Sequence, residues 1–128
     1  MTHAEFRALA VASIRHQMQT GIADITLTSP GRRPGRAGQV SVSYTDGQRT
    51  VPEIANLMHT FQANGIDVYV VSAGFEPLVE AIASSPAFGY NLPADKVYGL
   101  RLEEEPDGTY KPEYRHGYPV TFGPASRR

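Results

Sequence analysis

The stretch Gly65-Ile66-Asp67-Val68-Tyr69-Val70-Val71-Ser72-Ala73-Gly74-Phe75 decides the expected fold of this chain. Residues 66–71 are nearly all apolar and mostly β-branched, which is typical of a strand covered on both faces of a sheet. We therefore expect Tyr69 to lie in the core. The small residues Ser72, Ala73 and Gly74 follow at the C-terminal end of this strand. A helix is expected after them, with Pro77 in its first turn, where proline is tolerated.

The sequence on either side of this stretch predicts a further helix and a further strand. Thr50-Val51-Pro52-Glu53 has the spacing of a capping box, in which threonine and glutamate satisfy N–H groups at a helix start. We expect that helix to end at Asn64-Gly65. Residues 97–102 predict another strand. Helix, buried strand, small-residue turn and helix in this order predict part of an α/β doubly wound sheet.

Residues 1–49 are expected to form a helix and two strands around a long loop. Thr2 and Glu5 have the spacing of a capping box, and the apolar spacing after them predicts a helix over residues 4–19. Residues 22–27 and 40–45 each predict a strand. The loop over residues 29–38 holds two prolines, three glycines and three arginines. Its arginines suit contact with an anion, but a solvated loop is the interpretation we favour.

Ser72, Ala73 and Gly74 are the candidate binding residues. Ligands of open α/β sheets bind at the carboxyl ends of the strands, where these residues are expected. The Ser72 hydroxyl and the N–H groups of Ala73 and Gly74, at the start of a helix, together suit an anion. The alternative is that Ser72 only caps the following helix. Spacing alone favours neither interpretation.

The other polar residues are weaker candidates. The chain has four histidines, His3, His16, His59 and His116. No two of them have the spacing of a metal-ligand pair. The aromatic and basic cluster over residues 114–118 is expected on a hairpin surface rather than at a substrate mouth. The acidic run over residues 103–105 is expected beside a solvated turn.

The quoted stretch resembles the second motif of haloacid-dehalogenase (HAD) superfamily phosphatases, in particular the phosphoserine and phosphorylcholine phosphatase-like branch. The resemblance covers residues 50–124, including the helix before the stretch and the run that ends in Gly123-Pro124. Residues 1–49 are similar to the end of the family's cap segment. The resemblance implies a partial HAD-like Rossmannoid sheet over residues 50–128, with a helical cap remnant over residues 1–49.

The resemblance also implies phosphoester hydrolysis. Such enzymes use an aspartate nucleophile, a second aspartate as general acid and base, and a magnesium ion that neutralises phosphoryl charge. Ser72, with Ala73 and Gly74, takes the phosphate-binding role, and the substrate is expected to be a small phosphorylated metabolite.

The chain departs from the family pattern at the other motifs. No Asp-x-Asp-x-Thr occurs in the sequence, and Asp24 is followed by Ile25 and Thr26. The family's third-motif lysine is absent after Gly123-Pro124. We therefore assign no catalytic residue and no metal ligand, and expect no cofactor for this chain alone. The chain is therefore expected to be a fragment of a phosphomonoester hydrolase that is inactive by itself.

A second function class follows from the missing first-motif strand, which in the resembled family lies beside the strand that carries Ser72. Without it, residues 66–71 form an unpaired apolar edge that favours pairing with another chain. The alternative is therefore a non-catalytic module that binds an anion or completes its sheet with another chain. Self-association through this edge is one form of that expectation.

Composition excludes several other classes. The 128 residues carry 12 Lys and Arg against 13 Asp and Glu, which argues against a nucleic-acid partner. There is no cysteine, so thiolate chemistry is excluded. No apolar run approaches the roughly 18 residues that cross a bilayer, so no membrane partner is expected. No signal peptide is visible, and a cytoplasmic location is the default expectation.

Overall fold

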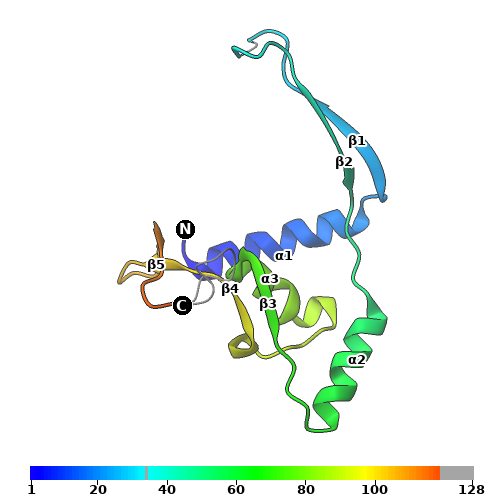
Figure 1. Ribbon diagram of the computed structural model, residues 1–128, viewed down its shortest axis with the longest axis vertical. Helices are drawn as coiled ribbons and strands as arrows, with labels where there is room; N and C mark the ends of the chain where they lie inside the picture. The colour runs from blue at the N-terminus through cyan, green and yellow to red at the C-terminus, as the bar shows by residue number, and fades with distance from the viewer. Residues whose placement is uncertain (34, 119–128) are drawn as a thin grey trace. The chain divides into compact units, whose positions relative to one another are not determined.

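The computed structural model describes residues 1–33 and 35–118. Within these ranges the chain is mixed α/β, with three α-helices and three two-stranded sheets (Figure 1). The predicted α/β class is thus confirmed in this general form, while the doubly wound sheet stays an expectation. The chain divides into two compact units. One combines residues 1–13 with the chain from Thr50 onward, and the other spans residues 14–49.

Helix α1 (His3–Gln19) begins in the first unit and ends in the second. It starts with the predicted capping box. The N–H of Thr2 donates to Glu5 Oε2 at 2.8 Å, and the N–H of Glu5 donates to Thr2 Oγ1 at 3.3 Å. The first unit then holds α2 (Pro52–Ala63), β3 (Val70–Phe75), α3 (Glu76–Ala83), the 3-10 turns η1 (Pro86–Phe88) and η2 (Ala94–Lys96), β4 (Val97–Leu100), β5 (Leu102–Glu104) and β6 (Tyr110–Tyr114).

The second predicted capping box is wrong. Helix α2 has Val51 at its N-cap and no side-chain cap. Its start lies one residue later than the box requires, so Thr50 and Glu53 stand out of position to bond reciprocally. The N–H of Val51 instead donates to the hydroxyl of Tyr90 at 3.0 Å. A residue 39 positions away therefore does what a local cap was expected to do.

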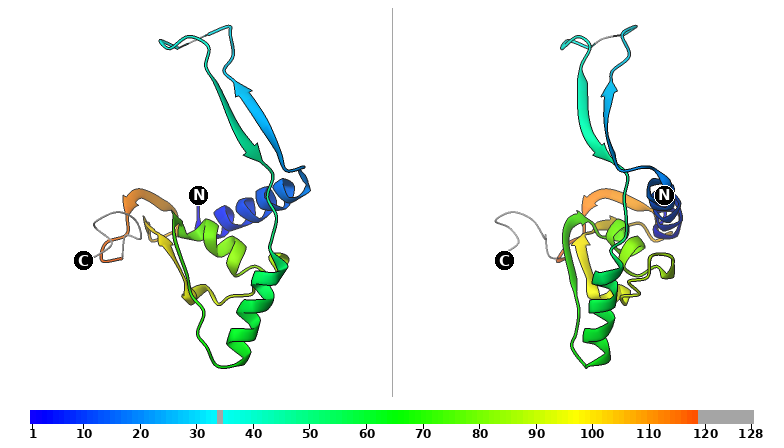
Figure 2. Two further views of the ribbon diagram at one scale, coloured as in Figure 1. Left: turned by 45° about the vertical axis from the view of Figure 1, so that its right-hand side comes forward. Right: turned by 90° about the vertical axis from the view of Figure 1, so that its right-hand side faces the viewer.

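Strands β3 and β4 run parallel, with α3 between them in the chain (Figure 2). Val70 pairs with Val97 and Val71 with Tyr98, but the next pair is Phe75 with Leu100. Residues 72–74 therefore lie opposite Gly99 alone and form a bulge in β3. A side chain at Gly99 would lie 2.8 Å from both the Gly74 carbonyl oxygen and Glu76 Cα. Glycine at this position is what lets the bulge approach β4.

The predicted strand over residues 66–71 is wrong in its bounds and its burial. Residues 66–69 are not in a strand, because the only strand paired with β3 in the described chain begins at Val97, opposite Val70. The expectation of two covered faces also fails. Tyr69 is 53% exposed and Val71 is 70% exposed. Apolar composition thus identified the strand region but not which of its residues have a partner.

The core of the first unit lies between α3 and β4. Its buried members are Ala83, Leu92 and Val97. Partly buried side chains pack against them from α2, the segment before β3, β3 itself and α3, namely Met58, Val68, Val70 and Val79. Leu92 is 1% exposed and Val97 is 2% exposed. This cluster fixes β3 beside α3 and so positions the bulge.

The second unit contains the hairpin of β1 (Ala23–Thr28) and β2 (Ser41–Asp46), which agrees with the two strands predicted there. The pairing is antiparallel and regular from Ala23 with Asp46 to Thr28 with Ser41. The strand expected over residues 97–102 is divided into β4, which pairs with β3, and β5, which forms a second hairpin with β6 in the first unit. No helix in the described ranges is long and apolar enough to cross a membrane.

Candidate functional site

The candidate site is the bulge of β3 that carries Ser72, Ala73 and Gly74. The Gly74 N–H donates to Ser72 Oγ at 3.0 Å, which closes a local turn. Ala73 and Gly74 are exposed and Ser72 is half-buried, so a ligand can reach the backbone here. Helix α3 follows directly, with Phe75 as its N-cap and no side-chain cap bond. Ser72 therefore does not cap this helix, as the alternative interpretation required.

A groove of about 490 Å³ lies beside the bulge in the first unit. Ser72 and Gly74 line it together with side chains of α2, β3, α3 and the following segment: Ile54, Met58, Val70, Leu78, Val79, Ile82, Ala83 and Tyr90. Most of these are apolar. The groove can therefore take an apolar side chain or ligand group whose polar end meets Ser72.

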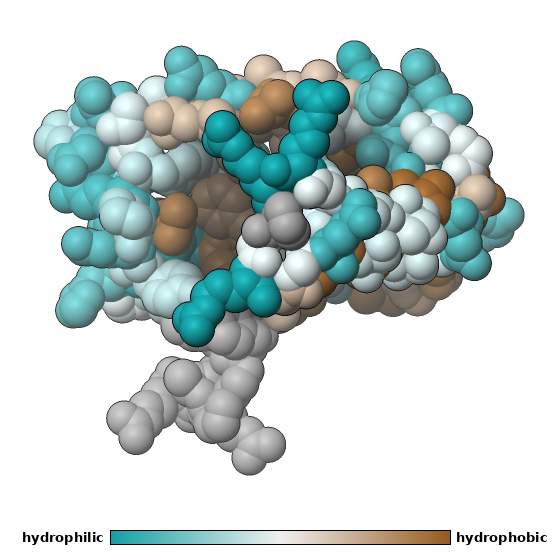
Figure 3. All heavy atoms as spheres, turned by 90° about the horizontal axis from the view of Figure 1, so that it is seen from above, coloured by the Kyte–Doolittle hydropathy of each residue, from teal (hydrophilic) through white to brown (hydrophobic). Residues whose placement is uncertain are grey.

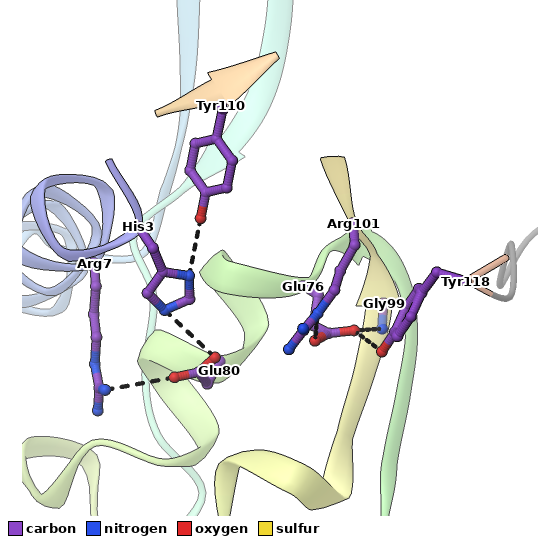
Figure 4. A network of polar contacts seen from close by, with 8 residues as sticks. All are labelled: His3, Arg7, Glu76, Glu80, Gly99, Arg101, Tyr110 and Tyr118. Atoms are coloured by element: carbon purple, nitrogen blue, oxygen red, sulfur yellow. Dashed lines mark hydrogen bonds and ion pairs between the residues drawn. The ribbon is translucent and has the colours of Figure 1, made fainter. Parts of the chain in front are cut away.

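Two carboxylates of α3 are almost fully buried, and the sequence reasoning missed both. Glu76 is 1% exposed and Glu80 is 5% exposed. Figure 4 shows that each accepts bonds from residues far away in the chain. A buried carboxylate is stable only when it is paired and hydrogen-bonded, so the partners of these two residues determine how α3 is held.

Glu76 joins α3 to β4 and to the segment after β6. Its Oε2 accepts the Gly99 N–H at 2.9 Å and the Tyr118 hydroxyl, and its Oε1 accepts the Arg101 guanidinium (Figure 4). Arg101 also lies over the Tyr118 ring, 5.2 Å from its centroid. Both oxygens of Glu76 are thus engaged, immediately after the bulge.

This pairing shifts two pKa values. Burial, followed by the hydrogen bond to Glu76, raises the pKa of Tyr118 to about 12. Burial opposes charge on Arg101, but the hydrogen bond and charge of Glu76 outweigh it and raise the pKa of Arg101. The arginine stays charged and the tyrosine stays neutral at neutral pH. The positive charge of Arg101 compensates Glu76 close to where an anion is expected to bind.

Glu80 joins α3 to the start of α1. Arg7 Nη1 lies 3.4 Å from Glu80 Oε1, and His3 Nε2 lies 3.6 Å from Glu80 Oε2 (Figure 4). The other ring nitrogen of His3 bonds the Tyr110 hydroxyl at 2.9 Å. Residues of α1 predicted as part of a cap remnant are thus bonded to α3 of the first unit.

One sequence signal could have identified these carboxylates. Glu76 and Glu80 stand four positions apart in Glu76–Ala83, a helix whose other residues are all apolar or proline. Residues at i and i+4 share one face of a helix. Two acids on one face of an apolar helix predict buried partners, although nothing local indicates which ones.

The described residues do not fit a magnesium site. No group of three or more His, Asp or Glu in residues 1–33 and 35–118 is placed to hold a metal ion. Hard cations require several oxygen ligands, and both Glu76 oxygens already accept hydrogen bonds. Gly123, Pro124 and the tail where the third-motif lysine was sought lie outside the described residues.

The remaining candidates do not join the site. His59 Nε2 bonds the Tyr90 carbonyl oxygen at 3.0 Å, which holds α2 to the segment after α3. The N–H of His116 donates to Glu103 Oε1 in the turn after β6. From the 114–118 cluster, only Tyr118 reaches the neighbourhood of the bulge, through Glu76.

The chain has a partial sequence match and a structural match that covers nearly its whole length. No known family model matches the chain. A phosphorylcholine phosphatase of Pseudomonas aeruginosa is 43% identical over 44 residues, which are 34% of this chain and 13% of that protein. This short match supports a phosphatase-like relationship.

The structural match covers nearly the whole chain. The crystal structure of a conserved, functionally unknown protein from Anaerococcus prevotii aligns with a TM-score of 0.86 and 30% sequence identity. It covers 94% of this chain and 31% of that chain. The 128 residues thus span less than a third of either similar protein, and each of those proteins has much additional chain.

Proposed function

We propose that this chain carries the phosphoryl-binding part of a HAD-type phosphomonoester hydrolase. The Ser72 hydroxyl and the N–H groups of Ala73 and Gly74 bind the phosphoryl oxygens of a small phosphorylated metabolite. The Gly74 N–H exchanges its bond to Ser72 Oγ for one to a phosphoryl oxygen. The observation that carries the proposal is the bulge of β3, which exposes this backbone directly before the first turn of α3. The short match to a phosphorylcholine phosphatase supports the same chemistry.

The chain by itself is proposed to bind and not to hydrolyse. The sequence has no Asp-x-Asp-x-Thr, so no aspartate stands at the position where the family forms its covalent intermediate. The two nearest buried carboxylates, Glu76 and Glu80, are paired with cations and hydroxyls and are not available as nucleophiles.

Backbone amide shifts during titration with phosphorylcholine, phosphoserine and inorganic phosphate test this proposal. We expect the Ala73 and Gly74 signals to move at millimolar ligand, and Ser72→Ala to weaken the apparent affinity at least threefold. Ser43→Ala on β2 is the matched control and leaves the affinity unchanged. Unmoved Ala73 and Gly74 signals, or phosphate release by the purified chain that Ser72→Ala abolishes, contradict the proposal.

A second candidate function is completion of the β3 sheet by another polypeptide segment. Within the described residues β3 pairs only with β4, and none of the other described strands lies along its second edge. Val71 is 70% exposed at this strand, and the adjoining groove of about 490 Å³ is largely apolar. An extended apolar segment that adds to this edge would satisfy backbone groups and fill the groove.

Val71→Lys tests this second function because a charge on an edge strand blocks strand addition. Lys at this exposed position leaves the core contacts of β3 in place. We expect the variant to lose capture of an extended apolar peptide while Ser72→Ala retains it. Equal capture by Val71→Lys and the unchanged chain contradicts the proposal.

A further inference from the structure

The β1–β2 hairpin has two faces of opposite chemistry. Its register places Ile25 opposite Tyr44 and Leu27 opposite Val42, so these four side chains share one face. The other face holds hydroxyls that bond across the strands, with Thr26 to Ser43 at 2.7 Å and Thr28 to Ser41 at 2.8 Å. One face is thus closed by its own hydrogen bonds and the other is apolar.

The apolar face is open to solvent. Leu27 is 54% exposed, Val42 is 59% exposed and Tyr44 is 44% exposed. Val40, 53% exposed, continues this face beyond β2, because its carbonyl oxygen accepts the Ser29 N–H at 2.8 Å. A two-stranded hairpin is at best marginally stable in water, so an apolar face of this kind favours an occupant.

The two ends of the apolar face carry opposite charges. The loop has Arg32, Arg33 and Arg36, all exposed, and no acidic residue occurs from position 25 to position 45. Figure 3, which looks onto this loop, shows strongly hydrophilic side chains gathered there. Asp46 lies at the opposite end, two positions from Tyr44 and therefore on the apolar face. No ion pair within the described ranges involves Asp46 or these arginines.

We propose that the apolar face of the β1–β2 hairpin is an interface that binds the same face of a second copy of this chain. The two hairpins pack antiparallel, so that the arginine loop of each lies beside Asp46 of the other. Such a pairing is self-complementary, as a two-fold interface requires. It covers Leu27, Val42 and Tyr44 in both copies and places Asp46 of each copy beside arginines of the other.

Length and charge determine how such a dimer behaves. Six-residue strands span about 20 Å. A face of four large side chains on them therefore buries an area at the low end of the range for specific interfaces. We therefore expect micromolar association that weakens with salt, because the charge pairs at its ends are exposed. The hydroxyl face makes no contribution.

Sedimentation of the full chain between about 1 and 500 μM tests the proposal. Leu27→Thr combined with Val42→Thr keeps strand-forming residues but removes apolar surface. We expect this variant to raise the dissociation constant at least tenfold. Ser43→Thr on the hydroxyl face is the matched control and changes it less than twofold. A chain that stays monomeric throughout, or a dimer unaffected by the double variant, overturns the proposal.

Charge reversal tests the antiparallel arrangement. Asp46→Arg is expected to weaken association, as is a variant with Arg32, Arg33 and Arg36 all changed to Glu. Combining them restores association, because the opposite charges then meet again. Failure of this rescue overturns the antiparallel arrangement. A dimer that Val71→Lys abolishes, and that the hairpin variants leave intact, assigns association to the β3 edge and overturns the hairpin interface.

Discussion

Helix α3 and the β1–β2 hairpin are both regular elements, but their surroundings differ. Helix α3 carries two acidic side chains, and both are almost fully buried against partners from three other segments, the start of α1, the β4 region and the segment after β6. The hairpin carries apolar side chains such as Leu27 and Val42 that are more than half exposed. Helix α3 thus buries charged side chains, whereas the hairpin exposes apolar ones. Regular backbone pairing therefore does not show where the stability of this chain resides.

The largest expected effect on stability comes from a buried leucine of the first unit, compared with an exposed leucine of the hairpin. Leu92→Ala removes a side chain that is 1% exposed, and we expect a loss of about 2–5 kcal/mol of unfolding free energy. Leu27→Ala, at a position 54% exposed, is the matched control with an expected loss below about 0.5 kcal/mol. Urea unfolding at low protein concentration measures both. Equal losses would contradict the contrast between the regions.

Glu76→Ala is expected to have the next largest effect. The change leaves the Gly99 N–H and the Tyr118 hydroxyl without their acceptor and Arg101 without its counter-charge. Arg101 is partly exposed, which reduces the loss to about 2–4 kcal/mol. Chemical denaturation measures it, with Glu103→Ala as the control at a half-exposed acid. Similar values for the two variants would show that burial of Glu76 carries no special weight.

Gly99→Ala tests how tightly the bulge of β3 packs against β4, by adding a single methyl group. The new Cβ would meet Glu76 Cα and the Gly74 carbonyl oxygen at 2.8 Å, so the bulge must shift. We expect a loss of about 1–3 kcal/mol together with moved amide signals for residues 72–74. Gly21→Ala in the second unit meets nothing within 4 Å and serves as the control. Unmoved bulge signals in Gly99→Ala would contradict the role given to this glycine.

Alkaline pH should affect the α3 region through Tyr118. Its pKa is raised to about 12 from an ordinary value of 10.0, so the neutral phenol is favoured in the folded chain. The stability it contributes is complete below pH 10 and is lost as the pH rises from 10 to 12. Tyr118→Phe lowers stability at pH 7 by about 1 kcal/mol and flattens this dependence. An unchanged alkaline slope in the variant would contradict the assignment.

The smallest expected effect is at the start of α1. Thr2→Ala removes one side of the capping box and should cost about 0.5–1 kcal/mol. Hydrogen bonds from the backbone and side chain of Thr2 also lower the pKa of Glu5. The stability that these bonds give the helix is therefore present above the ordinary carboxyl pKa and is lost as the pH falls below it. Helix content followed by circular dichroism between pH 2 and 7 measures it. Thr20→Ala at the other end of α1 is the control.

Most elements were predictable because their signals are local. Apolar spacing and the Thr2–Glu5 box predict α1, and strict alternation predicts the strand that contains Val42 and Tyr44. Residues 66–69 were not predictable, because a strand needs a partner and no neighbouring residue indicates where β4 begins. The cap at Val51 was missed for the same reason, since its acceptor is Tyr90.

The candidate site was predictable in part. Small residues after an apolar run identified Ser72, Ala73 and Gly74, and their binding role stays a prediction. The partners of Glu76 were not predictable, because nothing near Glu76 in the sequence points to them. Gly99 and Arg101 lie in a predicted strand, and Tyr118 lies in a cluster expected on a hairpin surface. Only the folded chain brings these polar groups to the first turn of α3.

The distances along the chain between the bonded partners also bear on synthesis. Glu76 bonds residues that lie 23, 25 and 42 positions later in the chain. The partner of Glu80, Arg7, lies 73 positions earlier and is therefore synthesised before it. A ribosome that releases the chain from its N-terminus therefore makes the Arg7 contact possible first. Until Tyr118 has emerged, Glu76 cannot be fully paired. The emergence of Tyr118, rather than the formation of α3, thus completes the pairing of Glu76.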